Sequence, residues 1–79
     1  MGKRTGVLTN DLRGLRAGHG EMTQQELADL VGVTRQTVNA IEGNKYSPSL
    51  EVAFKISAMF GLPLDAVFQY QPDTTKPGV

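Results

Sequence analysis

The amino-acid sequence predicts a single all-α domain of five short helices. Three observations support this fold class. Short segments with apolar residues at helical spacing alternate with turn residues, strand-type alternation is rare, and a chain of 79 residues has room for one small core. Weak alternation at residues 69–71 allows a short terminal β-strand. Residues 1–71 are therefore expected to form the domain, and residues 72–79 a flexible tail.

The first helix is expected to run from Thr9 or Asn10 to Ala17. Thr9 is its candidate N-cap, because a threonine hydroxyl can accept a hydrogen bond from a free backbone N–H of the first helical turn. Gly18 and Gly20 follow the helix and are expected to end it. Three leucines share one apolar side at this spacing: Leu8, Leu12 and Leu15.

The second helix begins with a capping box at Thr23 and Glu26, in which the two side chains satisfy backbone N–H groups at opposite ends of one turn. Gly32 can adopt the left-handed conformation that ends this helix. Thr34 then caps a third helix over residues 35–43. Apolar residues on the inward faces of the two helices are Leu27, Leu30, Val31, Val38 and Ile41.

The fourth helix is expected to begin after Ser49, whose hydroxyl can cap it, and to end at Gly61. Pro63 suits the first turn of a brief fifth helix that reaches Phe68. The fourth helix is expected to bury a stripe made of Leu50, Ala53, Ile56 and Phe60.

The composition excludes several kinds of site. Without cysteine the chain has neither disulfides nor thiolate metal ligands, and one histidine leaves little for metal or nucleophile chemistry. Since no catalytic constellation can be assembled, the sequence predicts no enzyme activity, no cofactor and no small-molecule ligand. No apolar stretch has the length of a signal peptide or membrane span, so we expect no membrane association and a cytoplasmic location.

The charges of the chain are balanced. Eight Lys or Arg residues are matched by eight Asp or Glu residues, which gives a formal net charge of zero. Affinity for nucleic acid that comes almost wholly from neutralised phosphates needs a large basic surface. The composition therefore argues against a generic charge-driven binder and is compatible with a protein that recognises bases through locally placed side chains.

Residues 24–43 predict two short helices joined by a one-turn connection. Such a connection leaves little space between the helix axes, so a small residue, Ala28, is expected where they cross. The third helix then exposes the side opposite Val38 and Ile41. Arg35 on that side can form a bidentate contact with guanine, and Gln36 and Asn39 can do so with adenine. The pattern favours a helix that enters the major groove of DNA.

This run resembles the XRE-type helix-turn-helix family, which includes phage repressors and Cro, and the similar residues read TQQELADLVGVTRQTVNAIEGNKYSPSLEVAFKISAMFGLPLDAVF. The resemblance implies a lambda-repressor-like fold and a transcriptional regulator that binds double-stranded DNA. It also implies positions for individual contacts. Base contacts would come from Arg35, Gln36, Asn39 and Ala40, backbone contacts from Gln24, Thr34 and Lys45, and Thr37 would contact either the backbone or a thymine methyl group.

Two departures from the family pattern affect these implications. The loop at residues 18–22 is one residue longer than the usual connection, so a phosphate contact of Arg16 is not carried over. The family commonly has glycine where this chain has Asn44. Asparagine tolerates the left-handed conformation, so we expect the backbone to be unchanged there.

The C-terminal part of the domain predicts a homodimer. Its apolar residues exceed what one small domain can cover, and the expected interface consists of Leu64, Val67, Phe68 and Tyr70. A two-fold dimer would place two recognition helices about 34 Å apart and bind a palindromic operator. Additional DNA contacts are open for Lys3, Arg4 and Arg13. The alternative is an antitoxin-like or other protein-interaction module on the same fold.

Overall fold

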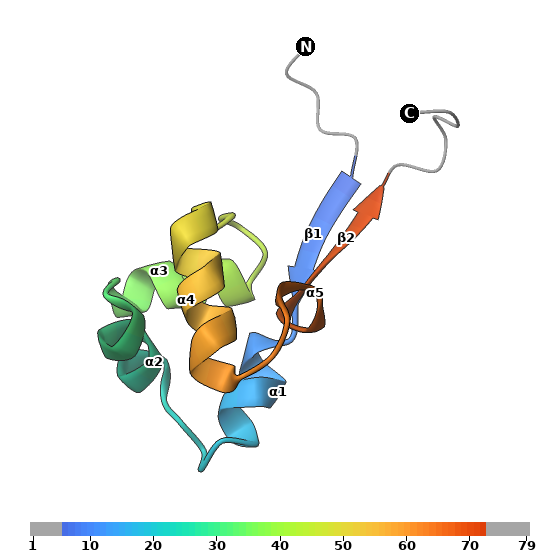
Figure 1. Ribbon diagram of the computed structural model, residues 1–79. Coiled ribbons are helices and arrows are strands. Elements are labelled where there is room, and N and C mark those ends of the chain that lie inside the picture. Colours follow the sequence, from blue (N-terminus) through green and yellow to red (C-terminus); the bar gives the residue numbers. More distant parts are fainter. Residues whose placement is uncertain (1–5, 73–79) are drawn as a thin grey trace.

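The computed structural model describes residues 6–72. The elements follow the order β1 (Gly6–Asn10), α1 (Leu12–Ala17), α2 (Gln24–Val31), α3 (Arg35–Glu42), α4 (Leu50–Phe60), α5 (Leu64–Val67) and β2 (Phe68–Pro72). The helices form the body of the molecule, and the paired strands extend from it, with Gly6 and Pro72 opposite each other at the outer end of the sheet (Figure 1). The fold is therefore mostly helical with a two-stranded sheet, rather than all-α.

The sheet contains one strand that the sequence predicted and one that it did not. β2 includes the expected residues 69–71 and pairs antiparallel with β1, so that Gly6 lies opposite Pro72 and Asn10 lies opposite Phe68. The expected start of the first helix at Thr9 or Asn10 is wrong, because both residues belong to β1. β1 pairs with a segment at the other end of the domain, and no short-range periodicity reports such a partner.

Asn10 takes the capping role that the sequence assigned to Thr9. Its Oδ1 accepts a hydrogen bond from the backbone N–H of Leu12 at 3.1 Å, whereas the N-cap residue Asp11 makes no side-chain capping bond. Pro72, expected in the flexible tail, is the last residue of β2. The rest of that tail, like Lys3 and Arg4, lies outside the described residues.

The predicted caps of the second, third and fourth helices are confirmed, whereas α3 ends one residue early at Glu42, and α5 (Leu64–Val67) has Pro63 as its N-cap and stops before Phe68, which begins β2. Thr23 and Glu26 form both bonds of the capping box, and Thr34 and Ser49 each accept a hydrogen bond from a backbone N–H of the first turn. Gly32 ends α2 in the left-handed conformation with φ of 80°. Asn44 also adopts positive φ, at 60°, as expected for the position where the family commonly has glycine.

The core lies between the helices and the base of the sheet, and its buried apolar residues are Leu12, Leu27, Ala28, Val31, Val38, Ile41, Ala53, Ile56, Val67 and Phe68. Two leucines expected in it are exposed instead, Leu30 by 61% and Leu50 by 67%. At about 100° per residue, Leu30 is turned well away from the arc formed by Leu27, Ala28 and Val31. Leu50 is the first residue of α4 and extends beyond the core, and Phe60 at its other end is half-buried.

Candidate nucleic-acid interface

Helices α2 and α3 pack closely against each other, as the sequence predicted. Ala28 on α2 is fully buried, and on α3 both Val38 and Ile41 are buried. Gly32 makes the turn between the helices with its backbone N–H donating to the carbonyl of Ala28 at 2.9 Å. This packing fixes which side of α3 faces outward.

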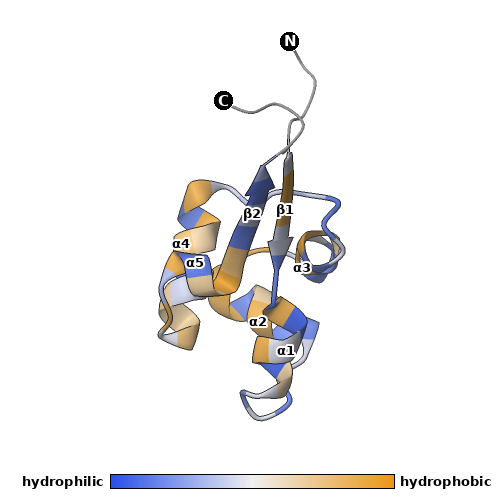
Figure 2. Ribbon diagram, turned by 90° about the vertical axis from the view of Figure 1, so that its right-hand side faces the viewer, coloured by the Kyte–Doolittle hydropathy of each residue, from blue (hydrophilic) through white to orange (hydrophobic). Residues whose placement is uncertain are grey.

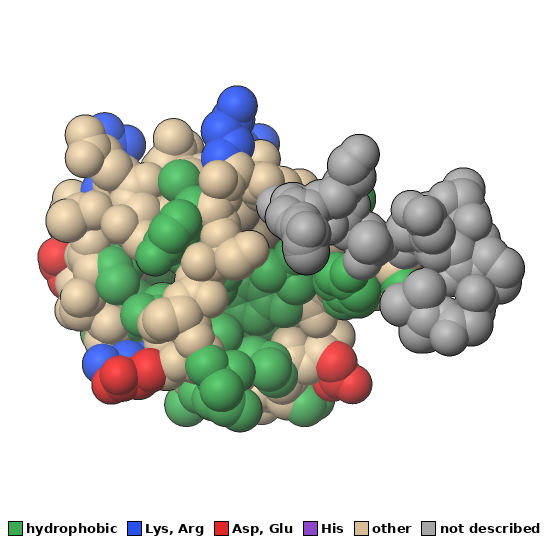
Figure 3. Space-filling view, turned by 90° about the horizontal axis from the view of Figure 1, so that it is seen from above, with side chains coloured by type: hydrophobic (Ala, Val, Ile, Leu, Met, Phe, Trp, Pro, Cys, Tyr) green, Lys and Arg blue, Asp and Glu red, His purple; other side chains and the backbone are tan. Residues whose placement is uncertain are grey.

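The outer side of α3 is polar and free of other elements. In Figure 2, α3 lies at one side of the body and α4 at the other, with the two strands between them. Seen from above in Figure 3, Lys and Arg side chains protrude along the upper edge, which is the side of α3, while hydrophobic side chains gather along the opposite edge. The α3 side of the molecule thus offers cations and amides.

The residues expected to contact DNA lie together on this side. Those expected at bases all belong to α3, with Arg35, Gln36 and Asn39 exposed and Ala40 half-buried. Of those expected at the DNA backbone, Thr34 and Lys45 are exposed, while Gln24 and Thr37 are half-buried. The Thr34 hydroxyl accepts from the backbone N–H of Thr37 at 3.1 Å, and the two hydroxyl oxygens are 3.0 Å apart.

A buried ion pair behind this surface joins α1 to α3. Arg16 Nε donates to Glu42 Oε2 at 2.6 Å, and Arg16 Nη2 donates to Glu42 Oε1 at 2.9 Å. The side chains are 14% and 3% exposed, respectively. Arg16 Nη1 also donates to the carbonyl of Met22 at 2.8 Å, which fixes the loop before α2. The guanidinium of Arg16 is therefore used inside the protein.

The carboxyl of Glu42 has its pKa set by opposing effects. Burial raises the pKa, but the hydrogen bonds from Arg16 and Gln24, together with the positive charges of Arg16 and Arg13, lower it more. The net direction is downward. The hydrogen bond with Glu42 in turn raises the pKa of Arg16, against the effect of its burial. Both groups are consequently charged at neutral pH.

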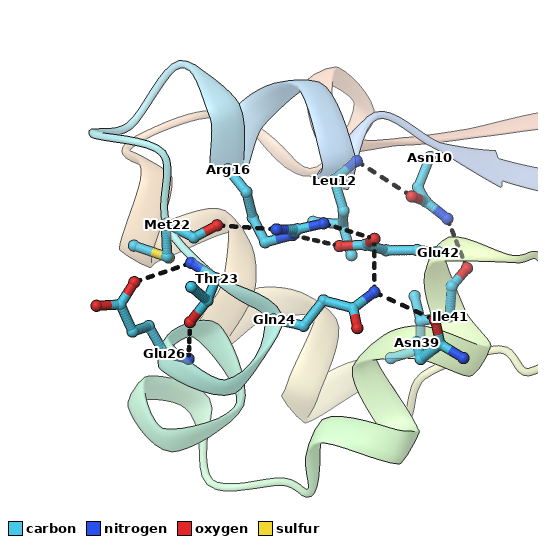
Figure 4. A network of polar contacts seen from close by, with 10 residues as sticks. All are labelled: Asn10, Leu12, Arg16, Met22, Thr23, Gln24, Glu26, Asn39, Ile41 and Glu42. Atoms are coloured by element: carbon cyan, nitrogen blue, oxygen red, sulfur yellow. Dashed lines mark hydrogen bonds and ion pairs between the residues drawn. The ribbon is translucent and has the colours of Figure 1, made fainter.

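The ion pair continues as a chain of hydrogen bonds to the outer face of α3, as Figure 4 shows. Gln24 Nε2, at the start of α2, donates to Glu42 Oε1 at 3.0 Å and to Asn39 Oδ1 at 3.2 Å. The chain Arg16, Glu42, Gln24, Asn39 therefore runs from the buried interior to an exposed side chain expected to contact a base.

A second side chain fixes the other end of α3. Asn10 Nδ2 donates to the backbone carbonyl of Ile41 at 2.8 Å and to Asn44 Oδ1 at 3.2 Å. The carbonyl of Ile41 also accepts from the backbone N–H of Asn44 at 3.0 Å, so Asn10 supplies a second donor at the end of α3, where carbonyls lack partners within the helix. It also connects the end of α3 to the start of α1.

Sequence reasoning missed the positioning parts of Asn10, Arg16 and Glu42. From the sequence, Asn10 is expected only at the start of a helix, Arg16 is considered only as a phosphate contact, and Glu42 has no expected role. Their contacts join residues 26 to 34 positions apart in the chain. A glutamate within an otherwise uncharged part of α3, after Val38 and Ile41, was the one available signal.

The expected dimer residues do not all lie at the surface. Val67 is fully buried and Phe68 is 7% exposed, so both belong to the core of the single chain, which corrects the sequence-based expectation that they lie at the surface; Val67 is not available to a partner, and Phe68 offers only a small exposed part. Leu64 is half-buried and Tyr70 is 56% exposed. These two line an open, mainly apolar hollow together with Leu8, Asp65, Phe68 and Gln69.

Two other features are absent from residues 6–72. No three residues among His, Asp and Glu come together there in a way that could hold a metal ion. No helix in this part of the chain is long and apolar enough to span a bilayer.

Comparison with known proteins gives concordant results. The helix-turn-helix family model matches residues 12–67. An uncharacterized HTH-type transcriptional regulator of Methanocaldococcus jannaschii is 47% identical over 66 residues, which cover 84% of this chain and 98% of that protein. A second such regulator, YgzD of Bacillus subtilis, is 46% identical over 61 residues, 77% of this chain and 91% of YgzD. The solved structure of the transcriptional regulator VanUg shares the fold with a TM-score of 0.71 at 20% identity, covering 91% of this chain and 95% of its own.

Proposed function

Because this chain belongs to the helix-turn-helix family of transcriptional regulators, we propose that it binds a palindromic double-stranded DNA site in a sequence-specific manner as a homodimer. In this proposal α3 enters the major groove. The observation that carries it is the outer face of α3, where exposed Arg35, Gln36 and Asn39 stand on a helix anchored by buried Val38 and Ile41.

Each side chain on this face has a role that suits its chemistry. Arg35 can donate to O6 and N7 of guanine, Gln36 and Asn39 can pair with N6 and N7 of adenine, and Ala40 can pack against a thymine methyl group. The remaining exposed or half-buried side chains contact the sugar-phosphate backbone and set the register of α3: Thr34, Thr37 and Lys45. The family pattern also places Gln24 at the backbone, but both N–H groups of its amide are bonded, to Glu42 and to Asn39, so it contacts the backbone by packing alone.

Replacing Arg35 with Ala is expected to weaken binding to the preferred site by about 1–3 kcal/mol and to relax the preference at one base pair. The measurement is fluorescence anisotropy with the preferred site and with substituted sites, at one fixed salt concentration. Lys55→Ala is the matched control, since Lys55 is an exposed cation on α4, on the other side of the molecule. Equal loss on every sequence would assign Arg35 to phosphate instead of a base.

The sequence of the operator can be identified by selecting the duplexes that the protein binds from a random DNA pool. A palindromic motif with half-sites about 10 base pairs apart is expected, because two α3 helices on a two-fold dimer repeat after one turn of DNA. If the wild-type protein enriches no motif at moderate salt, sequence-specific binding is refuted.

The dimer is proposed to form through the side of α5 and β2. The hollow there is lined by Leu8, Leu64 and Tyr70, and a two-stranded sheet is of marginal stability unless further strands or helices cover it. Pairing of this face with a second copy would bury both hollows. Sedimentation is expected to show a dimer at micromolar concentration and a monomer for Tyr70→Glu, whose added charge would be buried in the interface. A wild-type monomer that binds palindromes no better than half-sites would contradict the dimer.

A further inference from the structure

In the chain of hydrogen bonds from Arg16 to Asn39, the group that donates and the group that accepts are fixed at each step. A guanidinium can only donate hydrogen bonds, and an ionised carboxylate can only accept them. Arg16 donates to both oxygens of Glu42, and the two side chains are only 14% and 3% exposed. The carboxylate of Glu42 is therefore held as an acceptor that cannot change its role without breaking the ion pair.

The donor-to-acceptor direction of these bonds determines how two side-chain amides are oriented. An amide can present either its oxygen or its NH2 group, so an isolated glutamine or asparagine has no fixed orientation. Since Glu42 only accepts, Gln24 must turn its NH2 group toward it, and the bond of 3.0 Å is of that kind. The same Nε2 donates to Asn39 Oδ1 at 3.2 Å, so Asn39 must turn its oxygen toward Gln24. The Nδ2 donor of Asn39 is then turned away from Gln24 (Figure 4).

We propose that Glu42 is a specificity-determining positioning residue, which, through Gln24, fixes the orientation in which Asn39 is presented to the DNA base. The inference rests on the proposed function, because it assumes that α3 contacts bases. Glu42 itself contacts no DNA in this scheme, since its side chain is 3% exposed.

The fixed orientation defines the chemistry that Asn39 recognises. Its outward NH2 group donates to acceptors on a base edge, such as N7 of a purine. One lone pair of Oδ1 is used by Gln24, and the other can accept from N6 of adenine. The chain therefore favours adenine, which presents both the N7 acceptor and the N6 donor, at the base that Asn39 contacts, and disfavours cytosine, which presents only a donor there.

Glu42→Gln tests this inference by replacing an acceptor-only group with one that has an acceptor side and a donor side. Gln24 can then meet either side, so neither its amide nor that of Asn39 keeps one orientation. The base pair concerned is first identified with Asn39→Ala in the wild-type background. At that base pair the discrimination between adenine and cytosine is expected to fall by about fivefold or more in Glu42→Gln. Discrimination at the other base pairs, including the one lost in Arg35→Ala, is expected to remain.

The readout is base preference at each position, measured by selection from a random duplex pool and confirmed by anisotropy on substituted sites. Selections are run at 10 °C, with circular dichroism showing that each variant is folded. The matched control is Glu51→Gln, the same chemical change at an exposed carboxylate on α4, whose side chain is 78% exposed. It is expected to change no preference.

Gln24→Ala keeps the experiment decisive if Glu42→Gln does not fold. This variant removes the link to Asn39 but leaves the pair of Arg16 and Glu42 in place. Discrimination is expected to fall at the Asn39 base pair, with little uniform loss of affinity, because both N–H groups of Gln24 are bonded within the protein and are not available to phosphate.

The results separate this inference from the proposed function. A wild-type protein that selects no motif overturns the proposed function and, with it, this inference. A clear wild-type motif with undiminished discrimination at the Asn39 base pair in the variants overturns the inference alone. The inference is also overturned if Asn39→Ala loses no base preference, or if Glu42→Gln weakens discrimination equally at all positions, as general loosening of α3 would do.

Discussion

Replacing Arg16 with Met is expected to lower the free energy of unfolding by about 3–5 kcal/mol, because it leaves the charge of Glu42 buried without its partner. The two side chains are only 14% and 3% exposed, so water can compensate only in part for the lost guanidinium. The carbonyl of Met22 loses its donor as well. A domain of 79 residues has a total stability of about 4–12 kcal/mol. The substitution therefore removes a large part of it.

The pH dependence of this loss distinguishes the ion pair from simple packing. In the native protein the pKa of Glu42 is lowered. The ion pair therefore makes its full contribution to the stability of the fold at pH values above the ordinary glutamate pKa of about 4.3. This contribution is lost as the pH falls from that value toward the lowered pKa of the folded state. In Arg16→Met, burial without the cation raises the pKa of Glu42 instead. The variant should then recover stability, relative to the wild type, as the pH falls through that raised pKa.

Urea denaturation at several pH values measures both effects. The double variant Arg16→Met with Glu42→Leu is expected to regain most of the lost stability, since replacing a buried ion pair with apolar residues is often neutral or stabilising. A loss below about 1 kcal/mol, or one that is independent of pH between about 3 and 7, would show that the ion pair contributes little to the fold.

Ile41→Ala is expected to lower the free energy of unfolding by about 2–5 kcal/mol, the usual range for truncating a fully buried isoleucine. Ile41 is 1% exposed and lies on the inward side of α3, one residue before Glu42. Its backbone carbonyl, held by Asn10, is unaffected by the change. The loss should therefore come from the vacated space, and thermal and urea unfolding should report it equally.

Leu50→Ala is the matched control for this prediction. Leu50 is also a large apolar helix residue, but it is 67% exposed, and substitutions at such positions usually change stability by less than about 0.5 kcal/mol. Similar losses for the two variants would mean that Leu50 is buried in solution, for example by a second molecule. A small loss for both would place Ile41 outside the core.

Local chemistry in the sequence was enough to predict most of the helical body. The capping box at Thr23, the caps at Thr34 and Ser49, and the left-handed turn at Gly32 each depend on residues within one turn of each other. These are the features that the structure confirms. The polar outer face of α3 followed in the same way, from the helical spacing of Val38 and Ile41.

The features that were not predicted depend on contacts between distant parts of the chain. Thr9 has the chemistry of a helix cap, but Gln69 lies opposite it in the sheet and the strand pairing prevails. Leu50 and Leu30 have the right residue type for a core, but Leu50 lies at the exposed first turn of α4 and Leu30 is turned away from the buried side of α2. Val67 was assigned to a partner surface because the sequence does not show how much room the core of one chain provides.

The hydrogen-bond network behind α3 also depends on contacts between distant parts of the chain, so its functional role could not be predicted from the sequence. Arg35 and Asn39 could be proposed as base contacts from residue type and helix position alone. The orientation of the Asn39 amide could not, because Arg16 and Glu42 set it from α1 and from the buried end of α3, through Gln24 on α2. A pattern of residue types predicts which groups are available, whereas the direction of each hydrogen bond requires the fold.

The antiparallel pairing of β1 with β2 bears on how the domain can be joined to other molecules. Because Gly6 and Pro72 are partners at the outer end of the sheet, the first and last described residues leave the body at a single corner (Figure 1). A fluorescent label attached at Gly6 or at Pro72 would therefore occupy nearly the same region of space. A short linker between these ends should also permit circular permutants, with new ends opened in an exposed loop such as residues 18–21.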